Sequence, residues 1–526
     1  MTVSNAANAP TGAPPDPRRW WTLAVLCLSL ILIVAGNSSL NVSLPQIQEG
    51  LHTSSSSIQW IVDVYSLVFA GLLLPAGALA DRYGRKTALQ FGLVVFGLAS
   101  LISSFADAAW QLILLRAIMG LGAAFIMPGT LSILTNVFPP GERPRAISIW
   151  AGFAGFGGVL GTVASGLLLV HFAWGAIFLV NVPIVLLALG AGVFLVPNSK
   201  DPKDTVLDPP GALLAVAGLA VLLFGVIQAP EHGWLSPSIL AALIGGALLL
   251  TGFVVFELRT PEPMLDIRLF KIRPFSVGSG TITLQYFALY GLFFVIAQYF
   301  QLAQGYSPLK AALATFPLGF FSMIGAPISA GFVRRRGARV VVGTGLLVTA
   351  FGFVLLSRVT ASTPFLYILV AEILIGTGVG QTTAPSTTLI MSSVRMAKAG
   401  IGSAVNDTSR EVGGALGIAV MGSIVSSVYR SRIGEQLVGL PPNVARAARH
   451  SAVAALQQAK SAGASSPQLV HAARGTFADA FGTAMLAGAL MLLVAAAAVW
   501  RFQDRHGSPG TGDLPVSPQS EPAAGA

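Results

Sequence analysis

The sequence predicts an all-α polytopic membrane protein, and three observations support this fold class. Hydrophobic residues make up 54% of the 526-residue chain, charged residues only 10%, and the mean hydropathy is +0.74. A soluble domain carries about 25% charged residues. Apolar stretches of membrane-spanning length recur along the chain, and basic residues gather in alternate loops between them. Lipid is therefore the expected solvent for most of the surface.

The apolar stretches are counted by their length. A helix needs about 20 apolar residues to cross the hydrocarbon layer, and on that criterion the chain contains about fourteen spans. The first, from Trp20 to Leu44, is longer than the core of a signal peptide and lacks a small-x-small cleavage pattern, so we expect it to be retained. The spans begin near Trp20, Ile58, Thr87, Trp110, Ala146, Gly175, Pro209, Ser236, Ser276, Leu309, Val340, Pro364, Ala399 and Thr476.

The distribution of basic residues tests this count. Alternate loops carry clusters of Arg and Lys, whereas the short loops between them hold almost none, Lys310 and Arg358 being the exceptions. The positive-inside rule then puts both termini in the cytoplasm, which requires an even number of spans. A longer outer loop, 430–475, also carries basic residues, which is tolerated because long loops translocate largely regardless of charge. Its Ala-rich stretch is compatible with a short surface helix.

Two glycine patterns recur at one spacing. The segment 116–122 (RAIMGLG) is echoed by 372–378 (EILIGTG), and 157–161 is echoed by 413–417. The offsets agree, since 372 − 116 = 256 and 413 − 157 = 256. A looser echo pairs DRYGRK with RRRGAR. We therefore predict two six-helix halves related by duplication, with two extra helices inserted between them, an arrangement typical of secondary transporters.

These patterns divide the chain into five segments. In order, they are a disordered cytoplasmic tail, the N-terminal six-helix half, the two inserted helices, the C-terminal six-helix half with its long outer loop 430–475, and a second disordered cytoplasmic tail. Their boundaries are 1–17, 18–200, 201–258, 259–506 and 507–526.

The segment after the second span carries a specific motif. It reads GALADRYGRK from Gly77 to Lys86, and it resembles the cytoplasmic loop signature of the major facilitator superfamily, GxLaDrxGrkxxl, at every defining position. Glycine at 77 lets helices pack closely, and Asp81 can meet the N-terminus of a neighbouring helix. The resemblance implies a major facilitator fold and a cytoplasmic gating role for Gly77, Asp81, Arg82, Gly84, Arg85 and Lys86.

Other stretches resemble the fourteen-helix drug:proton antiporter subfamily, which contains quaternary-ammonium and multidrug efflux pumps. They include WIVDVYSLVFAG (60–71), FLVNVP (178–183) and the span 400–422. Two features depart from that pattern: Gly36 stands in place of the acid of the first span, and the antiporter motif of the fifth span lacks its proline. Close helix packing in the fifth span remains through Gly157, Gly161 and Gly166.

Ionisable residues inside spans are functional candidates by default, because burying one costs at least about 2.5–3.5 kcal/mol. Asp63 in the second span and Arg116 in the fourth lie at similar depth near the outer surface. They form either a structural ion pair or a site where Asp63, tuned by Arg116, exchanges a proton or meets a cationic substrate. Glu372 occupies the repeat position of Arg116, and it either binds a cation or pairs with Arg358.

A second charged group lies in the thirteenth span. Asp407 and Glu411 share one helix face because they are four residues apart. Arg410 can neutralise only one of them, which leaves the other carboxyl to take a proton or a cation. Related efflux pumps carry acids at both positions, so the resemblance implies a role in proton coupling or substrate binding.

Several functions are disfavoured by what the sequence lacks. No phosphate-binding P-loop pattern is present, which argues against direct use of ATP. The six histidines are scattered, so neither a metal site nor another cofactor is expected, and the single cysteine, Cys27, allows no internal disulfide. The net charge of +10 is assigned to membrane topology rather than to nucleic-acid binding.

The sequence therefore predicts a secondary active exporter of the bacterial inner (plasma) membrane, and not an enzyme. Its expected partners are protons, membrane lipid and a small lipophilic or cationic substrate, such as a drug or another toxic compound. One alternative is the export of an endogenous metabolite or a self-made antibiotic. Another is proton-coupled uptake, favoured by the altered fifth-span motif, and a third is a non-transporting sensor or scaffold. The fold does not identify the substrate.

Overall fold

Helices make up all the regular secondary structure in the part of the chain that this computed structural model describes. The described residues are 17–53, 55–199, 208–261, 263–437, 445–446, 448–449, 452–459 and 466–503. Fourteen helical segments among them are long and apolar enough to cross a membrane, which confirms the predicted all-α architecture and the number of spans. The two predicted tails lie, except for Pro17, outside the described residues.

The helices fall into three consecutive groups. We call α1–α7 the first half, α8 and α9 the inserted pair, and α10–α18 the second half. The first half contains α1 (Arg19–Gly50), α2 (Ser55–Tyr83), α3 (Arg85–Ser103), α4 (Ala109–Val137), α5 (Arg143–His171), α6 (Ala176–Leu179) and α7 (Asn181–Leu195). The inserted pair contains α8 (Pro209–His232) and α9 (Pro237–Arg259). The second half contains η1 (Ile267–Lys271), α10 (Arg273–Gln298), η2 (Tyr299–Ala303), α11 (Pro308–Ala314), α12 (Phe316–Arg336), α13 (Ala338–Leu356), α14 (Phe365–Ser392), η3 (Met396–Lys398), α15 (Ala399–Gln436), α17 (Ala452–Ala459) and α18 (Ser466–Phe502).

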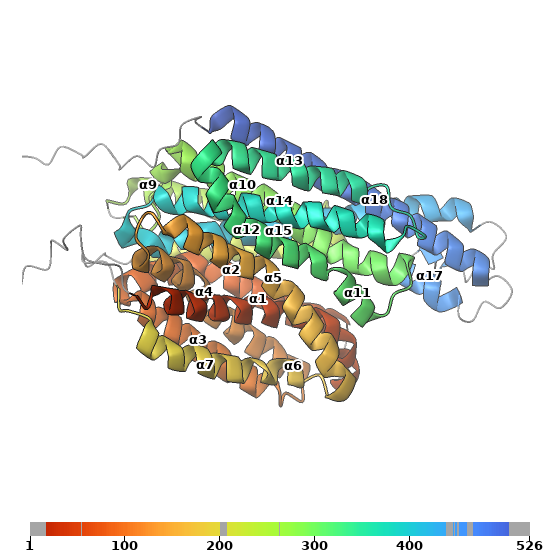
Figure 1. The fold of residues 1–526 in the computed structure, drawn as a ribbon. Coiled ribbons are helices and arrows are strands. Elements are labelled where there is room, and N and C mark those ends of the chain that lie inside the picture. The colour runs from red at the N-terminus through yellow and green to blue at the C-terminus, as the bar shows by residue number, and fades with distance from the viewer. Residues whose placement is uncertain are drawn as a thin grey trace, which may run out of the picture.

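The two halves lie side by side and repeat the same packing. Figure 1 shows the first half, from red to yellow, beside the green-to-blue second half. Helix α1 packs on α5 as α10 packs on α15, and α4 packs on α2 and α3 as α14 packs on α12 and α13. Between the halves, α2 contacts α15 and α5 contacts α12. Each half is thus a bundle with the same internal order, joined to the other along two seams.

Glycines set the closest helix contacts and give the register of the repeat. A Cβ on Gly161 of α5 would overlap the backbone of Ala35 in α1, and a Cβ on Gly417 of α15 would overlap the backbone of Phe287 in α10. Ala35 and Phe287 therefore occupy corresponding places, at an offset of 287 − 35 = 252. Only residues without a side chain allow such an approach of two helices.

The turn after the second helix of each half also requires glycine. Gly84, between α2 and α3, has φ +112°, and Gly337, between α12 and α13, has φ +79°. Residues with a Cβ rarely adopt this conformation. The two glycines are the centres of the looser echo seen in the sequence, DRYGRK and RRRGAR.

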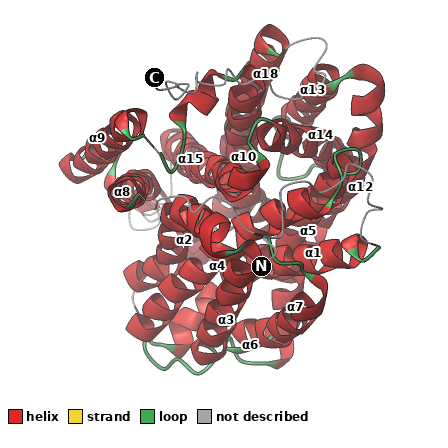
Figure 2. Cartoon of the chain, turned by 90° about the vertical axis from the view of Figure 1, so that its left-hand side faces the viewer, coloured by secondary structure: helices red, strands yellow, loops and turns green. Residues whose placement is uncertain are grey.

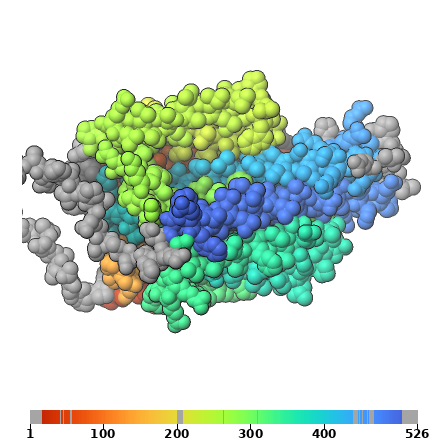
Figure 3. All heavy atoms as spheres, turned by 90° about the horizontal axis from the view of Figure 1, so that it is seen from above, coloured from red at the N-terminus to blue at the C-terminus, as the bar shows by residue number. Residues whose placement is uncertain are grey.

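The inserted pair lies against one seam between the halves. Helix α8 contacts both α2 and α15, and α9 packs mainly on α8. Figure 2, an end-on view, shows α9 at the outer edge and α8 beside α2 and α15. In Figure 3 the pair forms a yellow-green ridge along one edge of the molecule. Trp234, just after α8, donates to the Ser423 hydroxyl of α15 at 2.9 Å, which ties the pair to the second half.

The C-terminal end of α15 and the N-terminal end of α18 extend farther than the sequence predicted. The last span was expected to begin near Thr476, but α18 begins at Ser466, and α15 continues to Gln436. In the extra turns of α18, Leu469 and Ala473 are fully buried, so packing supports this part of the helix. Within the expected loop, α17 forms in the Ala-rich stretch and packs on α18.

Candidate functional site

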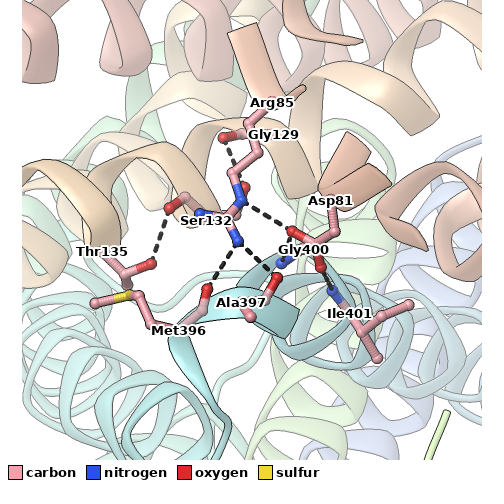
Figure 4. A network of polar contacts seen from close by, with 9 residues as sticks. All are labelled: Asp81, Arg85, Gly129, Ser132, Thr135, Met396, Ala397, Gly400 and Ile401. Atoms are coloured by element: carbon pink, nitrogen blue, oxygen red, sulfur yellow. Dashed lines mark hydrogen bonds and ion pairs between the residues drawn. The ribbon is translucent and has the colours of Figure 1, made fainter. Parts of the chain in front are cut away.

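The end of α2 makes a polar contact with the start of α15. The Asp81 carboxylate accepts hydrogen bonds from the backbone N–H groups of Gly400 at 2.9 Å and Ile401 at 3.2 Å. These N–H groups have no partner within the helix, and the helix dipole favours an anion there. One turn earlier, a Cβ on Gly77 would lie 2.6 Å from the Gly400 carbonyl oxygen, so a larger residue would force the helices apart. We call this contact the α2–α15 latch (Figure 4).

Arg85, at the start of α3, completes the latch. Its Nε donates to Asp81 at 2.8 Å, and its Nη2 donates to the carbonyl oxygens of Met396 at 2.8 Å and Ala397 at 3.0 Å (Figure 4). Asp81 and Arg85 are buried, with 3% and 2% of their surfaces exposed. Charge-assisted hydrogen bonds withdrawn from water are stronger than surface ion pairs. The latch therefore holds the two halves together at this end of the bundle.

Lys86, Arg82 and Gly84 of the motif have contacts within the first half. Lys86 donates to the Val193 carbonyl oxygen of α7 at 2.7 Å. The Arg82 guanidinium lies over the ring of Tyr83, 5.4 Å from its centroid. Gly84 makes the turn described above. Asp81, Arg85 and Gly77 of the motif reach the second half.

Arg116 lies at the opposite end of the first half from the latch. It is fully buried, and its Nε donates to the Ile61 carbonyl oxygen at 3.1 Å and its Nη2 to Asn37 Oδ1 at 3.0 Å. Its guanidinium also lies 4.2 Å from the ring centroid of Tyr65. Among the described residues Arg116 forms no ion pair with Asp63, so the predicted structural pair is absent. Neutral partners and an aromatic face hold this cation instead.

Asp63 lies on the side of α2 that the inserted pair covers. It is 8% exposed, and its Oδ2 has no hydrogen-bond partner in the described structure. Glu231, near the end of α8, is the charged group that acts on it electrostatically. One turn before Asp63, Gln59 Nε2 donates to Gln228 Oε1 of α8 at 3.4 Å. This side of α2 thus faces α8, whereas Arg116 reaches α2 at Ile61 and Tyr65.

The charged group of α15 lies where both halves meet. Arg410 Nη1 is 3.8 Å from Asp407 Oδ1, and both residues are almost completely buried. The guanidinium lies 4.6 Å from the ring centroid of Tyr286 in α10 and 5.7 Å from that of Trp150 in α5 of the first half. Asn406 Nδ2 donates to Asp407 at 3.1 Å. Asp407 is therefore the acid that Arg410 neutralises.

Glu411 is the second acid of this group. It is half-buried, and it lies within electrostatic range of Arg410, of Tyr65 in α2 and of Tyr290 in α10. Because Arg410 is paired with Asp407, Glu411 is the carboxyl of the group that the described ion pairs leave without a cation. It is also the acid that connects the Arg116–Tyr65 cluster of the first half with the Asp407–Arg410 pair of the second.

Glu372 is the most isolated charged residue of the described structure that the sequence singled out. Its surface is 0% exposed, and neither of its carboxylate oxygens has a hydrogen-bond partner among the described residues. The predicted pairing with Arg358 does not form in this part of the chain, where Glu372 belongs to no ion pair.

The repeat explains why Glu372 has no partner. The glycines one turn after Arg116 and Glu372 touch the backbones of Tyr65 and Leu318, respectively. Tyr65 and Leu318 therefore occupy corresponding places in the two halves. The ring of Tyr65 supports Arg116, whereas the corresponding residue near Glu372 is the aliphatic Leu318. An acid in such surroundings is costly to ionise unless a cation joins it.

The three glycines of the fifth span do not share one contact. Gly157 and Gly161 lie against α1, at Val34 and Ala35. Gly166 instead faces the side chain of Leu309 in α11, across the seam between the halves. Of these three glycines, the first two therefore pack α5 closely on α1.

The aromatic residues of the site were not identified from the sequence. Tyr65, Trp150 and Tyr286 all face the buried guanidinium groups. Asn37 lies directly after Gly36 in the first span and supplies the polar partner of Arg116. The sequence does contain a usable signal for them, because aromatic residues in spans of a protein with buried arginines are candidates for cation–π contacts.

Comparison with known proteins gives consistent results. The model of the Major Facilitator Superfamily matches residues 26–418. The multidrug efflux pump LfrA of Mycolicibacterium smegmatis is 36% identical over 491 residues, covering 93% of this chain and 97% of that protein. The puromycin resistance protein pur8 of Streptomyces alboniger is 35% identical over 416 residues, covering 78% and 82%. Among solved structures, an inward-facing, unoccupied bacterial homologue of the human lysosomal transporter Spinster has a TM-score of 0.58 at 19% identity, covering 94% of this chain and 100% of that one. At this identity the likeness shows the fold.

Proposed function

Because the chain belongs to the Major Facilitator Superfamily, we propose that this multi-pass membrane protein exports lipophilic, cationic compounds from a bacterial cell in exchange for protons. It lies in the inner membrane with both termini in the cytoplasm. The observation that carries the proposal is the charged group at the junction of the halves, formed by the buried Asp407 and Arg410 and the half-buried Glu411. Ionisable residues at such positions mark substrate or proton pathways.

The composition of this group suits a cation. Two carboxyl groups and one guanidinium leave an excess of negative charge when both acids are ionised. The rings of Tyr286 and Trp150 add electron-rich faces, which attract organic cations. A proton on Glu411 removes the charge excess, so protonation and cation binding compete at one place. Such competition is the requirement for antiport.

The latch supplies the conformational element of the proposed mechanism. Asp81 and Arg85 hold α2 and η3–α15 together at the cytoplasmic end, so this arrangement is closed to the cytoplasm. Opening requires the four hydrogen bonds of the latch that cross between the halves to break. An exchange cycle then alternates between this state and one in which the latch is released.

Relatives support efflux as the direction of transport. One is named a multidrug efflux pump and another a puromycin resistance protein. Export of a compound that the cell itself makes is the variant of the proposal that differs only in cargo. The membrane potential can drive either process, since one charge moved through 100 mV releases about 2.3 kcal/mol.

Two measurements test the proposal. A pump-deficient bacterium that expresses the chain is challenged with cationic dyes, biocides and antibiotics, and we expect higher inhibitory concentrations for lipophilic cations. Inverted vesicles from the same cells are then loaded with a pH-sensitive dye, and each protective compound should release protons from the vesicle lumen. Protection without proton release would contradict antiport and leave another energy source.

A further inference from the structure

The second half contains a set of buried polar side chains, three of which lie between the level of Asp407 and the latch. They come from three adjacent helices: Ser279 and Gln285 from α10, Ser386 from α14 and Ser403 from α15. Each is at least 95% buried. Helices α10, α14 and α15 pack on one another.

Most of this polar capacity has no protein partner in the described structure. The hydroxyl groups of Ser279, Ser386 and Ser403 and the Oε1 of Gln285 make no hydrogen bond there, nor does the second oxygen of Asp407. Gln285 Nε2, in contrast, donates to α14. Buried polar groups without a partner are costly, and ordered water is the usual partner where protein supplies none.

The register of the helices arranges these groups in a line. A Cβ on Gly278 would lie 2.9 Å from the Ser386 carbonyl oxygen, so the neighbouring Ser279 is level with Ser386. On α15, Ser403 lies four residues, or about 6 Å, below Asp407 and three residues above Gly400 of the latch. Thr387, next to Ser386, donates to Asn406, next to Asp407, at 3.0 Å, so Ser279 and Ser386 are level with Asp407. The line therefore starts at the level of Asp407 and continues toward the latch through Ser403. Gln285, which donates to the Val379 carbonyl oxygen, lies on the far side of Asp407 from the latch.

The first half has no such line at the corresponding places. Corresponding residues of α1 and α10 differ by 252 in number. A second pair of contacts confirms this offset: Ile31 lies against Gly157, Thr283 lies against Gly413, and 283 − 31 = 252. The offset in the other helices is 256. Four polar residues of the second half therefore have apolar or thiol counterparts in the first: Cys27 for Ser279, Ile33 for Gln285, Ile147 for Ser403 and Ala151 for Asp407.

One corresponding residue of the first half is polar, but its hydrogen bonds are satisfied. Thr130 corresponds to Ser386, since 386 − 130 = 256. Its hydroxyl donates to the Met127 carbonyl oxygen at 2.8 Å and accepts from Trp150 Nε1 at 3.1 Å. The unsatisfied polar line is thus specific to the second half and is not a general property of the repeated bundle.

We propose that Ser279, Ser386 and Ser403 hold water molecules that conduct protons between the Asp407–Glu411 acid pair and the cytoplasm, through the second half alone. In the inward step the O–H bond of a protonated carboxyl breaks, the proton joins a water molecule as hydronium, and the carboxylate remains behind. The proton leaves where Ser403 meets the latch. This proposal rests on the proposed proton antiport, but the presence of water is testable without it.

The first test measures water at each position, using the single cysteine of the chain. In a Cys27→Ser background, cysteine replaces Ser403 or Ser386, and the matched controls are Ile147→Cys and Thr130→Cys. Inverted vesicles are treated with 2-aminoethyl methanethiosulfonate, which reacts with thiolates and therefore needs water at the sulfur. We expect reaction at 403 and 386 to be at least tenfold faster than at 147 and 130. Equal rates at the paired positions would overturn the water line, whether or not the protein transports protons.

The second test measures conduction. Ser386→Val and Ser403→Val should each lower substrate-induced proton release severalfold while leaving energy-independent substrate exchange intact, and Ser403→Thr should restore release. The control is Ser148→Val, which removes a buried first-half hydroxyl bonded to the Pro144 carbonyl oxygen. Normal proton release in both valine variants would overturn the proposed path. If the unaltered protein releases no protons, the antiport proposal fails, and the cysteine rates still decide whether the line holds water.

Discussion

Asp81 at the end of α2 and Gly400 at the start of α15 are joined by a hydrogen bond of 2.9 Å that crosses from the first half to the second. The same carboxylate binds Arg85, which reaches two carbonyl oxygens just before α15. One acidic side chain thus links an ion pair to a helix N-terminus. A change at this position should affect the equilibrium between the closed and open states of the seam more than it affects folding within either half.

We therefore expect Asp81→Asn to lower transport at least tenfold while expression and substrate binding stay close to those of the unaltered protein. The amide keeps the shape but loses the charge, and hydrogen bonds to charged groups contribute about 1.5–3 kcal/mol each. Drug-resistance assays and equilibrium binding in detergent measure the two effects. Lys86→Gln is the matched control, because Lys86 bonds only within the first half in the described structure. Full transport by Asp81→Asn would remove the gating role.

The repeat positions 116 and 372 should respond differently to neutralisation. Arg116→Gln loses the contacts to Ile61, Asn37 and Tyr65, at a cost of about 2–3 kcal/mol, and should lower the thermal midpoint in detergent. Glu372→Gln has no hydrogen bond to lose in the described structure, so its midpoint should be unchanged or higher. A loss of stability in Glu372→Gln equal to that of Arg116→Gln would show that Glu372 has a partner in the folded protein.

Glu142 gives a pH-dependent contribution outside the spans. Its side chain binds Arg19 at 2.7 Å, and this hydrogen bond, with the charge of Arg19, lowers the pKa of Glu142 from its ordinary value of 4.5. A lowered folded-state pKa stabilises the protein above the unfolded pKa, and the contribution is lost as pH falls through the folded value.

The thermal midpoint of the unaltered protein should therefore exceed that of Glu142→Gln at pH 7, and the difference should shrink as the pH falls below 4.5. Thermal unfolding in detergent at several pH values measures it. Arg19→Gln should show the same pH dependence as Glu142→Gln. A difference that grows on acidification would mean that the Glu142 carboxylate destabilises the fold.

Part of this structure could be predicted from sequence because membrane burial imposes simple rules. Span number follows from apolar length and loop charge, and the contact of Asp81 with a helix N-terminus was anticipated from its motif. The partners of Asp63 could not be predicted, because depth along a helix is readable from sequence but the direction of a side chain around the helix axis is not. Depth alone placed Asp63 beside Arg116, whereas the rotation of α2 turns it toward α8. The early start of α18 was missed because its first turns are polar and lie beyond the apolar core of the span.

The last prediction concerns the division of labour between Glu411 and Asp63. The described ion pairs leave Glu411 without a cation because Arg410 pairs with Asp407 at 3.8 Å, so we expect Glu411 to be the acid that gains and loses the proton. We expect Glu411→Gln to abolish substrate-induced proton release but to permit energy-independent exchange of substrate. Asp63→Asn should keep proton release and should weaken resistance to cationic compounds while sparing neutral ones, since Asp63 lies away from the Arg410 group, beside α8. Inverted vesicles with a pH-sensitive dye and a matched pair of cationic and neutral substrates measure both variants. Normal coupling in Glu411→Gln together with lost coupling in Asp63→Asn would reverse the two assignments and place proton exchange at the seam between α2 and the inserted pair.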